Sequence, residues 1–325
     1  MRIATFNVEN LDDRPGQQPS LATRVAIMRP QLERLRADIL CLQEVHSQGP
    51  SGARHFAALE ALLAGTPAAG FHRAKTQTTG GEPYDVRNLV TLSRWPITET
   101  RIIRDSDAAR PQYRMATARP PDDEADLLEW ERPMLYTRIE APHGPLHLVN
   151  LHLKSKLPVS VPGQKLDRWT WRSVSGWAEG SFVASMKRMG QAVQARLLID
   201  ALFDAHGLDA MIAVCGDFNA EAREVPVKAI CGPVEETGNP AHAPRVMVPC
   251  ENNIPEPARY SLLHLGRGQM LDHIIVSRPL LRWFLGAEVH NEALPDESGA
   301  LRRDTHFPES DHAPVVAAFE PVGAG

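Results

Sequence analysis

The sequence lacks the features that mark membrane-spanning and secreted proteins. No apolar run approaches the roughly 20 residues needed to span a bilayer, so we expect no membrane span. The first ten residues, MRIATFNVEN, contain no basic segment followed by an apolar one. This start argues against a secretory signal and favours a cytoplasmic protein, although a processed precursor would show the same start.

Cysteine is scarce, and its spacing excludes a thiolate zinc site. The four cysteines are Cys41, Cys215, Cys231 and Cys250, and no two of them have CxxC spacing. Two of them lie in apolar runs of strand length. We therefore predict buried free thiols, as expected in a reducing compartment.

The sequence also lacks an excess of positive charge. The net charge is -5 and the pI is about 6.2, and no run of lysine and arginine resembles that of a processive DNA-binding protein. A nucleic-acid partner would have to be bound by a local basic patch or through metal ions. Nor is there a nucleophile elbow, a P-loop or an HExxH motif, which excludes several common hydrolase mechanisms.

What the chain does contain is typical of a globular α/β protein. It has 325 residues, of which 43% are hydrophobic and 23% charged, enough for a large core. Short apolar runs alternate with helical patterns: an amphipathic helix over 181–205 leads into an apolar strand over 211–215. A second helix is predicted over 22–37, kinked or restarted at Pro30, and residues 286–309 read as loop. We expect one domain over 1–325.

The stretch MIAVCGDFNAE, residues 211–221, combines a buried strand with polar groups at its end. Asp217 and Asn219 lie two residues apart, so in extended backbone both side chains point to one face. Such a pair can hold a phosphate or a hard cation, but Gly-Asp-x-Asn is also ordinary turn chemistry. The stretch alone does not decide between them.

Five further strand ends carry polar groups of the same kind. A carboxylate at the end of an apolar run is expensive to bury unpaired, so a metal ion or an arginine is its expected partner. One such end is unremarkable, whereas six indicate that the ends converge in one cleft. The further ends are Asn7 with Glu9, Glu44, Asn150 with His152, Asp272, and Asp311 with His312.

The residue types in this set favour metal-assisted hydrolysis. Carboxylate and amide oxygens suit Mg²⁺ or Mn²⁺, and histidines beside carboxylates supply acid–base groups near neutrality. Arg87 and Lys154 are candidates to neutralise phosphate oxygens, with water as the nucleophile. Asn150, His152 and Lys154 alternate with leucines, so the wet face of an antiparallel sheet would give the same pattern. His273 should point to the opposite face from Asp272, and His46 and His306 read as surface or hydrogen-bonded residues.

Residues 155–180 form a predicted irregular insertion on the substrate side. Three tryptophans alternate there with Lys165, Arg168 and Arg172. Such a loop can stack a base or cover a substrate, or can simply be anchored by its indoles. The acidic run at 122–126 is expected to be a solvated loop or hairpin tip.

The ordered motifs resemble a known family over nearly the whole chain. TFNVEN, LQEV, NLVTLSRWPI, NLHLKSK, GDFNAE, LDHIIVS and SDHAPV are similar to those of the endonuclease/exonuclease/phosphatase superfamily, the metal-dependent group that includes DNase I. GDFN with the terminal SDH is the specific part. The resemblance implies an α/β fold built as a four-layer sandwich. Two mixed β-sheets would pack face to face with helices outside, and the site would lie at one edge of the sheets.

The resemblance also implies roles for individual residues. Glu44 would be the main metal ligand, with Asn7, Glu9 and Asp311 close by. His312 would act as general base or stabilise the transition state, with Asp272 hydrogen-bonded to it. Asp217 would position or activate the water beside Asn219. His152 would bind phosphate or protonate the leaving oxygen. Substrate binding is expected from Arg87, Asn150, Lys154, Arg168 and Arg172.

The leading hypothesis is a Mg²⁺- or Mn²⁺-dependent phosphodiesterase that acts on nucleic acid. The His at position 152 favours the DNase-like and phosphatase-like branches over the abasic-site endonucleases, which place a Tyr near the site. The alternative is a phosphomonoesterase for small-molecule, sugar or lipid phosphates, which the acidic pI favours. A third is an inactive binding module, against which the intact GDFN and SDH motifs argue.

Overall fold

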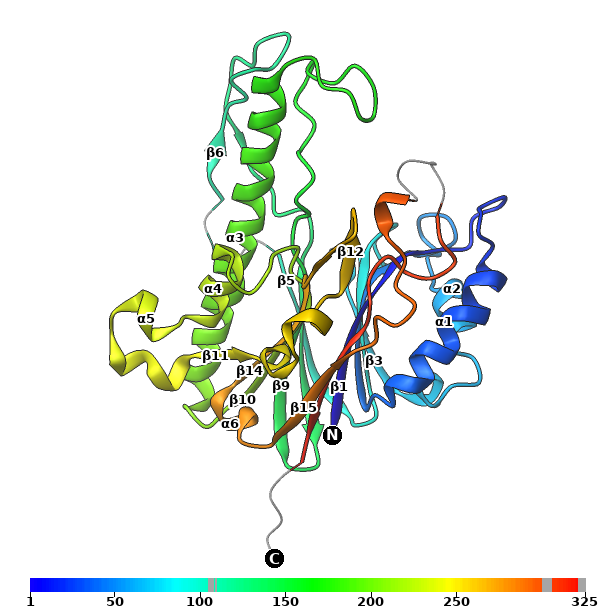
Figure 1. Cartoon of the computed structure of the whole chain (residues 1–325), viewed down its shortest axis with the longest axis vertical. Helices are drawn as coiled ribbons and strands as arrows, with labels where there is room; N and C mark the ends of the chain where they lie inside the picture. Colours follow the sequence, from blue (N-terminus) through cyan, green and yellow to red (C-terminus); the bar gives the residue numbers. More distant parts are fainter. Residues whose placement is uncertain (105–107, 109, 300–305, 321–325) are drawn as a thin grey trace, which may run out of the picture.

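Two six-stranded mixed β-sheets form the centre of the structure, a computed structural model that describes residues 1–104, 108, 110–299 and 306–320 (Figure 1). In spatial order, the first sheet contains β15 (Phe284–Val289), β16 (Val315–Phe319), β1 (Arg2–Leu11), β2 (Ile39–Val45), β4 (Asn88–Ser93) and β3 (His72–Lys75). The second contains β11 (Met247–Pro249), β14 (Asp272–Ser277), β10 (Met211–Asp217), β9 (Gly144–His152), β8 (Met134–Ala141) and β5 (Ile97–Ile103).

The remaining elements cover these sheets or connect their strands. The helices are α1 (Leu21–Leu35), α2 (Ala57–Leu63), α3 (Val174–His206), α4 (Val225–Cys231), α5 (Val234–Thr237) and α6 (Arg278–Leu281). Short 3₁₀ helices are η1 (Pro67–Gly70), η2 (Pro240–Arg245), η3 (Cys250–Asn253) and η4 (Glu256–Ala258). Two small hairpins pair β6 (Gln112–Tyr113) with β7 (Asp126–Leu127), and β12 (Leu262–His264) with β13 (Arg267–Gln269).

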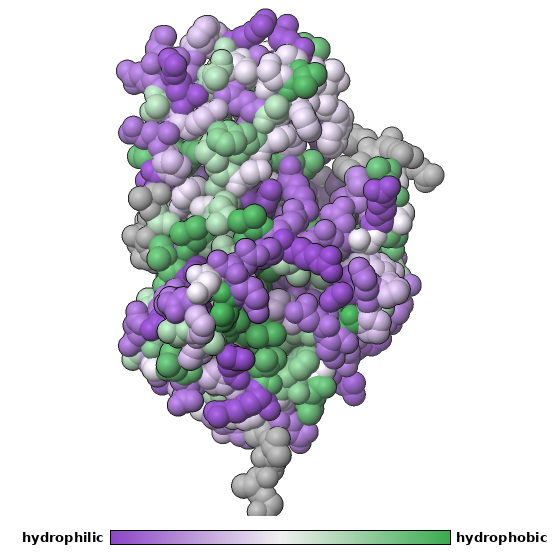
Figure 2. All heavy atoms as spheres, turned by 60° about the vertical axis from the view of Figure 1, so that its left-hand side comes forward, coloured by the Kyte–Doolittle hydropathy of each residue, from purple (hydrophilic) through white to green (hydrophobic). Residues whose placement is uncertain are grey.

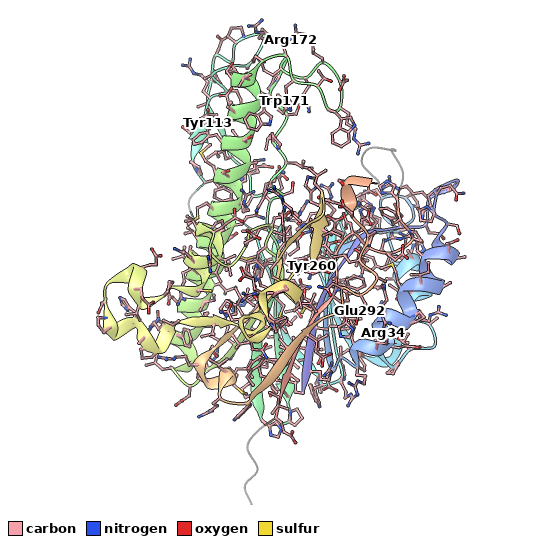
Figure 3. The ribbon with its side chains drawn as sticks, viewed as in Figure 1. Arg34, Tyr113, Trp171, Arg172, Tyr260 and Glu292 are labelled. Carbon is pink, nitrogen blue, oxygen red and sulfur yellow. The ribbon has the colours of Figure 1, made fainter. Side chains whose placement is uncertain are left out.

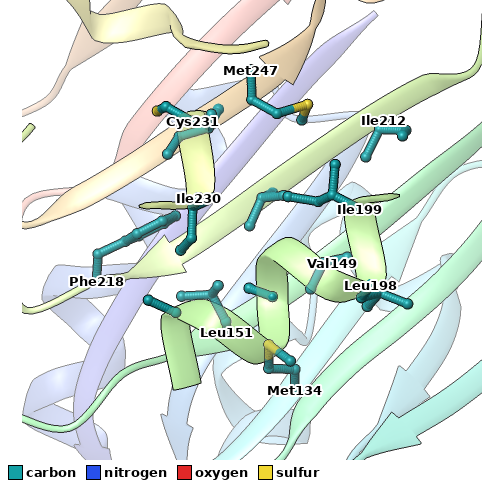
Figure 4. Close-up of a cluster of buried hydrophobic side chains, with 14 of the residues drawn as sticks. Met134, Val149, Leu151, Leu198, Ile199, Ile212, Phe218, Ile230, Cys231 and Met247 are labelled. Atoms are coloured by element: carbon teal, nitrogen blue, oxygen red, sulfur yellow. The ribbon is translucent and has the colours of Figure 1, made fainter. Parts of the chain in front are cut away.

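The central strands are apolar because both of their faces are covered. Between the two sheets lie side chains such as Ile3, Cys41 and Leu148. Helices α1 and α2 cover the outer face of the first sheet, and α3 and α4 cover that of the second (Figure 1). Figure 4 shows the second helix–sheet core, in which Leu198 and Ile199 of α3 are packed with Val149 and Leu151 of β9. The layers are therefore helix, sheet, sheet, helix, which confirms the predicted sandwich.

All four cysteines are buried and free, as predicted. None of the described helices is both long and apolar enough to cross a membrane. Figure 2 shows the face that carries α3 and α4, on which apolar and polar side chains are mixed. Val193 and Leu197 of α3 and Val225 of α4 are exposed apolar residues.

Helix α3 begins earlier than the sequence pattern predicted. Its N-cap is Ser173, whose hydroxyl accepts a hydrogen bond from the backbone N–H of Gly176, so the helix takes over the last seven residues of the predicted insertion. Glycines at 176 and 180 allow close packing here, because a Cβ on Gly180 would lie 2.4 Å from the carbonyl oxygen of Val159. The N-terminal half of α3 projects beyond the sheets (Figure 1).

We call this projection the arm: residues 174–190 of α3 together with segments 110–132 and 155–173. Glu179 of α3, which is 7% exposed, joins the helix to the segment 110–132. The Glu179 carboxylate accepts hydrogen bonds from the Tyr113 hydroxyl and from the backbone N–H groups of Ala116 and Thr117. The acidic run at 122–126 lies in the loop between β6 and β7, except for Asp126, which is the first residue of β7.

Two further sequence predictions differ from the structure. Helix α1 passes through Pro30 as one element, so the predicted restart is wrong. The segment 286–309, predicted as loop, begins with the last four residues of β15, which pairs antiparallel with β16. Residues 300–305 of that segment lie outside the described residues.

Candidate active site

The candidate site lies where strands of both sheets end at a common edge. β1 and β2 are parallel, and so are β9 and β10, so the carboxyl ends of each pair meet at one edge. In the second sheet the register places Asp217 of β10 directly beside His152 of β9 on one side and Asp272 of β14 on the other. Three predicted catalytic residues are thus neighbours across three strands.

Asp217 is the most densely hydrogen-bonded group of the site. Its Oδ2 accepts from Asn7 Nδ2 at 3.1 Å and Asn219 Nδ2 at 3.0 Å, and lies 3.1 Å from His152 Nε2. Its Oδ1 accepts from the backbone N–H of Asn219 at 2.8 Å. Burial raises the pKa of Asp217, but the imidazoles of His312 and His152 outweigh burial and lower the pKa below its ordinary value. Asp217 is therefore an ionised carboxylate.

His312 and Asp272 form a close pair beside Asp217. His312 Nδ1 lies 2.6 Å from Asp272 Oδ2, and His312 Nε2 lies 3.9 Å from Asp217 Oδ2. Burial disfavours the charged imidazole, yet the two carboxylates outweigh burial and hold the pKa of His312 well above its ordinary value. The second carboxylate oxygen of Asp272, Oδ1, is buried and has no hydrogen-bond partner among the residues that the structure describes.

Three carboxylates, Glu9, Glu44 and Asp311, form the acidic side of the site. Glu9 Oε2 accepts from the backbone N–H of Asp311 at 3.0 Å. Burial raises the pKa of Glu9 to about 7, although the Arg24 guanidinium opposes this shift, and burial together with Glu9 holds the pKa of Asp311 well above its ordinary value. Burial also acts on Glu44, but His152 and Arg132 outweigh it and lower its pKa.

The backbone is strained where these side chains are presented. Glu9, Glu44, Arg87 and Asn219 have positive φ angles of 42°, 61°, 60° and 48°. Residues other than glycine rarely adopt this left-handed backbone conformation, and each instance costs on the order of 1 kcal/mol. Five of the seven described non-glycine residues with positive φ lie at strand ends of the site, the fifth being Asn10. The strain coincides with the site.

The predicted metal ligands fit a hard cation. Asn7, Glu9, Glu44 and Asp311 offer amide and carboxylate oxygens, and the mutual repulsion of the three carboxylates is of the kind that a divalent cation relieves. Among the described residues, Asp217, Asp272 and His312 form a group whose ligand atoms all lie within 4.8 Å of one another. In that second group His312 is already bonded to Asp272, which suits proton transfer better than metal binding.

Of the five predicted substrate-binding residues, the structure does not bring three to the site. Asn150 is 0% exposed and lies between the sheets, where its Nδ2 donates to the carbonyls of Leu42 and Val90. The Lys154 ammonium donates to the Ser155 hydroxyl and the Leu157 carbonyl beneath the arm. Arg172 lies at the outer end of the arm and donates to the Gly163 carbonyl (Figure 3). These three expectations are corrected: each side chain donates hydrogen bonds to neighbouring protein groups, and none of the three lines the cavity beside Glu9.

The other two predicted substrate-binding arginines lie at the site. Arg87 is exposed and directly precedes β4, and its charge is among those that lower the pKa of Glu44. Arg168, from the arm, shares a cavity of about 330 Å³ with Glu9, Asn10 and Arg24. His273, as predicted, faces away from the site: it is 0% exposed and bonded to Glu251 and to the Ala220 carbonyl.

Sequence reasoning missed three groups at the site. Arg24 is 6% exposed and donates to the backbone carbonyls of Val8 and Glu9. A cation at helical spacing before the buried Met28 was the available signal. Arg132, which no pattern marked, donates to the Leu153 carbonyl. His46, expected to be a surface or hydrogen-bonded residue, is buried, and its Nδ1 lies 3.2 Å from Asp12 Oδ2. Its Nε2 has no hydrogen-bond partner in the described part of the chain.

Comparison with known proteins agrees with this architecture. The model of the Endonuclease/Exonuclease/phosphatase family matches residues 4–312. No match is found among curated proteins. Similar solved structures include a 3'-5' exonuclease from Neisseria meningitidis, with a TM-score of 0.55, 18% identity, and coverage of 98% of this chain and 100% of that one.

Two further solved structures have the same fold. One is an AP endonuclease from Archaeoglobus fulgidus, with a TM-score of 0.54, 16% identity, and coverage of 98% of this chain and 99% of that one. The other is a humanised TDP2 from D. rerio, with a TM-score of 0.55, 15% identity and coverage of 98% of each chain. At these identities the likeness establishes the fold.

Proposed function

Because the chain belongs to the endonuclease/exonuclease/phosphatase family, whose members hydrolyse phosphoesters, we propose that it is a divalent-metal-dependent phosphodiesterase that acts on nucleic acid. The observation that carries the proposal is the convergence on Asp217. His152, Asn219, Asn7 and His312 all lie within 4 Å of its carboxylate. A buried carboxylate surrounded by two imidazoles and two amides can orient a water molecule and take part in the transfer of its proton.

The proposed metal ligands are Asn7, Glu9, Glu44 and Asp311, with Mg²⁺ or Mn²⁺ as the ion. When bound, such an ion supplies positive charge to the phosphate oxygens. The carboxylates hold it on the acidic side of the site. Arg87, exposed beside Glu44, is proposed to bind a phosphate oxygen from the solvent side.

Asp217 is proposed to orient the attacking water. Its Oδ2 is taken up by Asn7, Asn219 and His152, whereas its Oδ1 accepts one described hydrogen bond, from Asn219. That oxygen keeps a lone pair for a water O–H. The Asn7 and Asn219 amides therefore hold the Asp217 carboxylate in one orientation, and the carboxylate in turn would orient the water.

His312 and His152 are the proposed proton-transfer residues. Asp272 binds His312 Nδ1, which leaves Nε2 on the side of Asp217 to contact the water or the phosphate oxygen that gains charge. As the water oxygen bonds to phosphorus and the ester bond breaks, one proton would pass from the water to the Asp217 carboxylate and one from a site imidazole to the leaving oxygen. His152, whose Nε2 lies 3.8 Å from Glu44 Oε1, is placed to bind the phosphate or to supply that second proton.

The test is a substrate panel with Mg²⁺, Mn²⁺ and Ca²⁺, run on the parent and on two variants. His312→Ala and Asp217→Asn should each lower turnover by orders of magnitude, with the circular dichroism spectrum of the folded parent retained. His242→Ala, an exposed histidine of η2, is the matched control and should keep parental turnover. Near-parental rates in both site variants would contradict the assigned roles.

The panel also separates the nucleic-acid proposal from the phosphomonoesterase alternative. It includes plasmid DNA, single-stranded DNA, RNA, a small diester and a small monoester. Cleavage of the small monoester with all nucleic acids left intact would contradict the diesterase proposal and favour the alternative. Chelation with EDTA should abolish turnover, and re-addition of Mn²⁺ should restore it.

A further inference from the structure

The loop of the arm that precedes α3 ends in an ordered hairpin, residues 165–171, which we call the tip hairpin. Leu166 N–H donates to the Thr170 carbonyl, and an isolated β-bridge joins Lys165 to Trp171. The Asp167 carboxylate accepts from the backbone N–H groups of Trp169 and Thr170, both at 2.7 Å. The turn is therefore fixed by its own hydrogen bonds.

This ordered turn presents an indole to solvent. Trp169 is 52% exposed, and the Arg168 guanidinium lies 4.6 Å from the centre of its ring. Lys165 is stacked 4.4 Å over Trp171 on the other side of the hairpin. Keeping a large apolar side chain in water on a structured turn has a cost that burial against a ligand would recover. An aromatic ring flanked by cations is the arrangement that binds unpaired bases and their phosphates.

The tip hairpin also lies at the mouth of the candidate active site. Arg168 lines the cavity of about 330 Å³ that Glu9 and Asn10 line from the body, together with Arg14 and Gln17 from the segment after β1. Figure 1 shows the loop before α3 bending from the top of the arm towards the side that carries β1 and α1. Figure 3 places Trp171 and Arg172 at the base of this bend. A substrate that enters past Glu9 therefore passes the tip hairpin.

We propose that the tip hairpin binds single-stranded nucleic acid, with Trp169 stacked on an unpaired base and Arg168 on an adjacent phosphate, so that the site selects single strands over duplexes. In a duplex the bases are stacked inside and present only their edges, so an indole has no free base face to cover. A single strand offers both a base face and a flexible backbone that can reach the strand-end carboxylates. This inference rests on the proposed function, since it specifies the substrate of that site.

The test is a binding measurement that needs no turnover. A fluorescently labelled oligothymidylate is titrated with the His312→Ala protein and with the same protein carrying Trp169→Ala, Trp169→Phe, Arg168→Gln or Trp177→Ala. Trp169→Ala should weaken binding about tenfold, as expected for one stacked base, and Trp169→Phe should recover most of it. Arg168→Gln should weaken binding and reduce its dependence on salt.

Trp177→Ala is the matched control, because Trp177 is 49% exposed on α3 and is not among the residues that line the cavity. It should bind like the parent. A duplex of the same length should compete poorly with the labelled strand. Equal affinity for Trp169→Ala and the parent, or equal competition by duplex, overturns the inference.

The outcome is separable from that of the proposed function. If the panel shows no hydrolysis but Trp169 is needed for strand binding, the proposed function fails and the tip hairpin still binds single strands. If the panel shows diester hydrolysis and Trp169→Ala leaves both binding and the single-strand preference in place, the inference fails alone.

Discussion

At the scale of single residues, His147 makes the stability of the fold depend on pH. Its side chain is 2% exposed, and Nδ1 lies 2.8 Å from the Tyr136 hydroxyl. Burial, together with the charges of His206 and Arg138, lowers the pKa of His147 to about 4. The unfolded chain, with an ordinary value near 6.5, binds more protons between these pH values. Stability from this residue is therefore present above about pH 6.5 and lost as pH falls towards 4.

The variant His147→Gln should remove this dependence, because the amide keeps an acceptor for the Tyr136 hydroxyl and does not titrate. Urea unfolding at pH 7 and at pH 4.5 should show the parent losing roughly 2 kcal/mol more than the variant, once solvent screening is allowed for. Other groups titrate in both proteins, so their contribution cancels in the difference. Equal losses in parent and variant would show that His147 is not the group responsible.

The alternation of side chains along a strand predicts which residues share a face, but not what covers that face. Asn150 and His152 lie two residues apart on the same face of β9. His152 lies at the end of the strand, in the site, whereas Asn150 is buried between the sheets and accepts a hydrogen bond from Gln43 of the other sheet. The sequence does not reveal that a second sheet covers this face. Asp217 and His312 were predictable, because GDFN and SDH are specific motifs at strand ends.

At the scale of elements, a tight contact within the arm holds α3 against the segment 110–132. A Cβ on Gly190 would lie 2.1 Å from Cη2 of Trp130, which is 7% exposed. Gly190→Ala would ordinarily stabilise a helix interior by about 1 kcal/mol. In this protein the new methyl group would clash with the Trp130 ring, so Gly190→Ala should be destabilising instead. The free energy of unfolding, measured by thermal and urea denaturation, should fall by about 1 to 3 kcal/mol.

The double variant Gly190→Ala with Trp130→Leu provides the check, because the smaller side chain makes room for the methyl group. It should be no less stable than Trp130→Leu alone. If Gly190→Ala is as stable as the parent, the α3–Trp130 packing is looser than the structure indicates. Hydrogen exchange in residues 110–132 should report the same loss locally.

The ends of helices and strands were predictable where a periodic pattern of apolar residues marks them. They were not predictable where capping or tertiary packing determines the end of the element. The amphipathic pattern located the middle of α3, whereas its first turns contain glycines and exposed residues such as Val174 and Trp177, whose helical state depends on the Ser173 cap and on contacts with 155–173. Likewise β15 mixes exposed and half-buried residues and is fixed by pairing with β16. Long-range pairing of this kind leaves little local signal.

At the scale of the whole molecule, the site joins the two sheets. Asn7 of the first sheet donates to Asp217 of the second, and the proposed metal ligands come from β1, β2 and the segment before β16. An ion bound there contacts elements that separate when the chain unfolds. The protein dialysed against EDTA should therefore gain stability on addition of Mn²⁺, by about 2.7 kcal/mol at a hundredfold excess over the dissociation constant.

This gain appears as an increase of a few degrees in unfolding temperature, measured by calorimetry. Glu44→Gln should reduce the metal-dependent increase, because it removes one of the three carboxylates. Glu256→Gln, an exposed position in η4, is the matched control and should keep the full increase. An increase of the same size in Glu44→Gln and in the parent would exclude Glu44 as a ligand.

The positive φ angles at Glu9, Glu44, Arg87 and Asn219 have a consequence for the protein's evolution and engineering. Glycine would relieve the strain of the positive φ angle at each of these positions. A selection for thermostability alone would therefore favour replacement of the residues that form the site. Stabilised descendants obtained without an activity screen should accumulate changes at these strand ends first. The same four positions are therefore those to hold fixed in any library built on this scaffold.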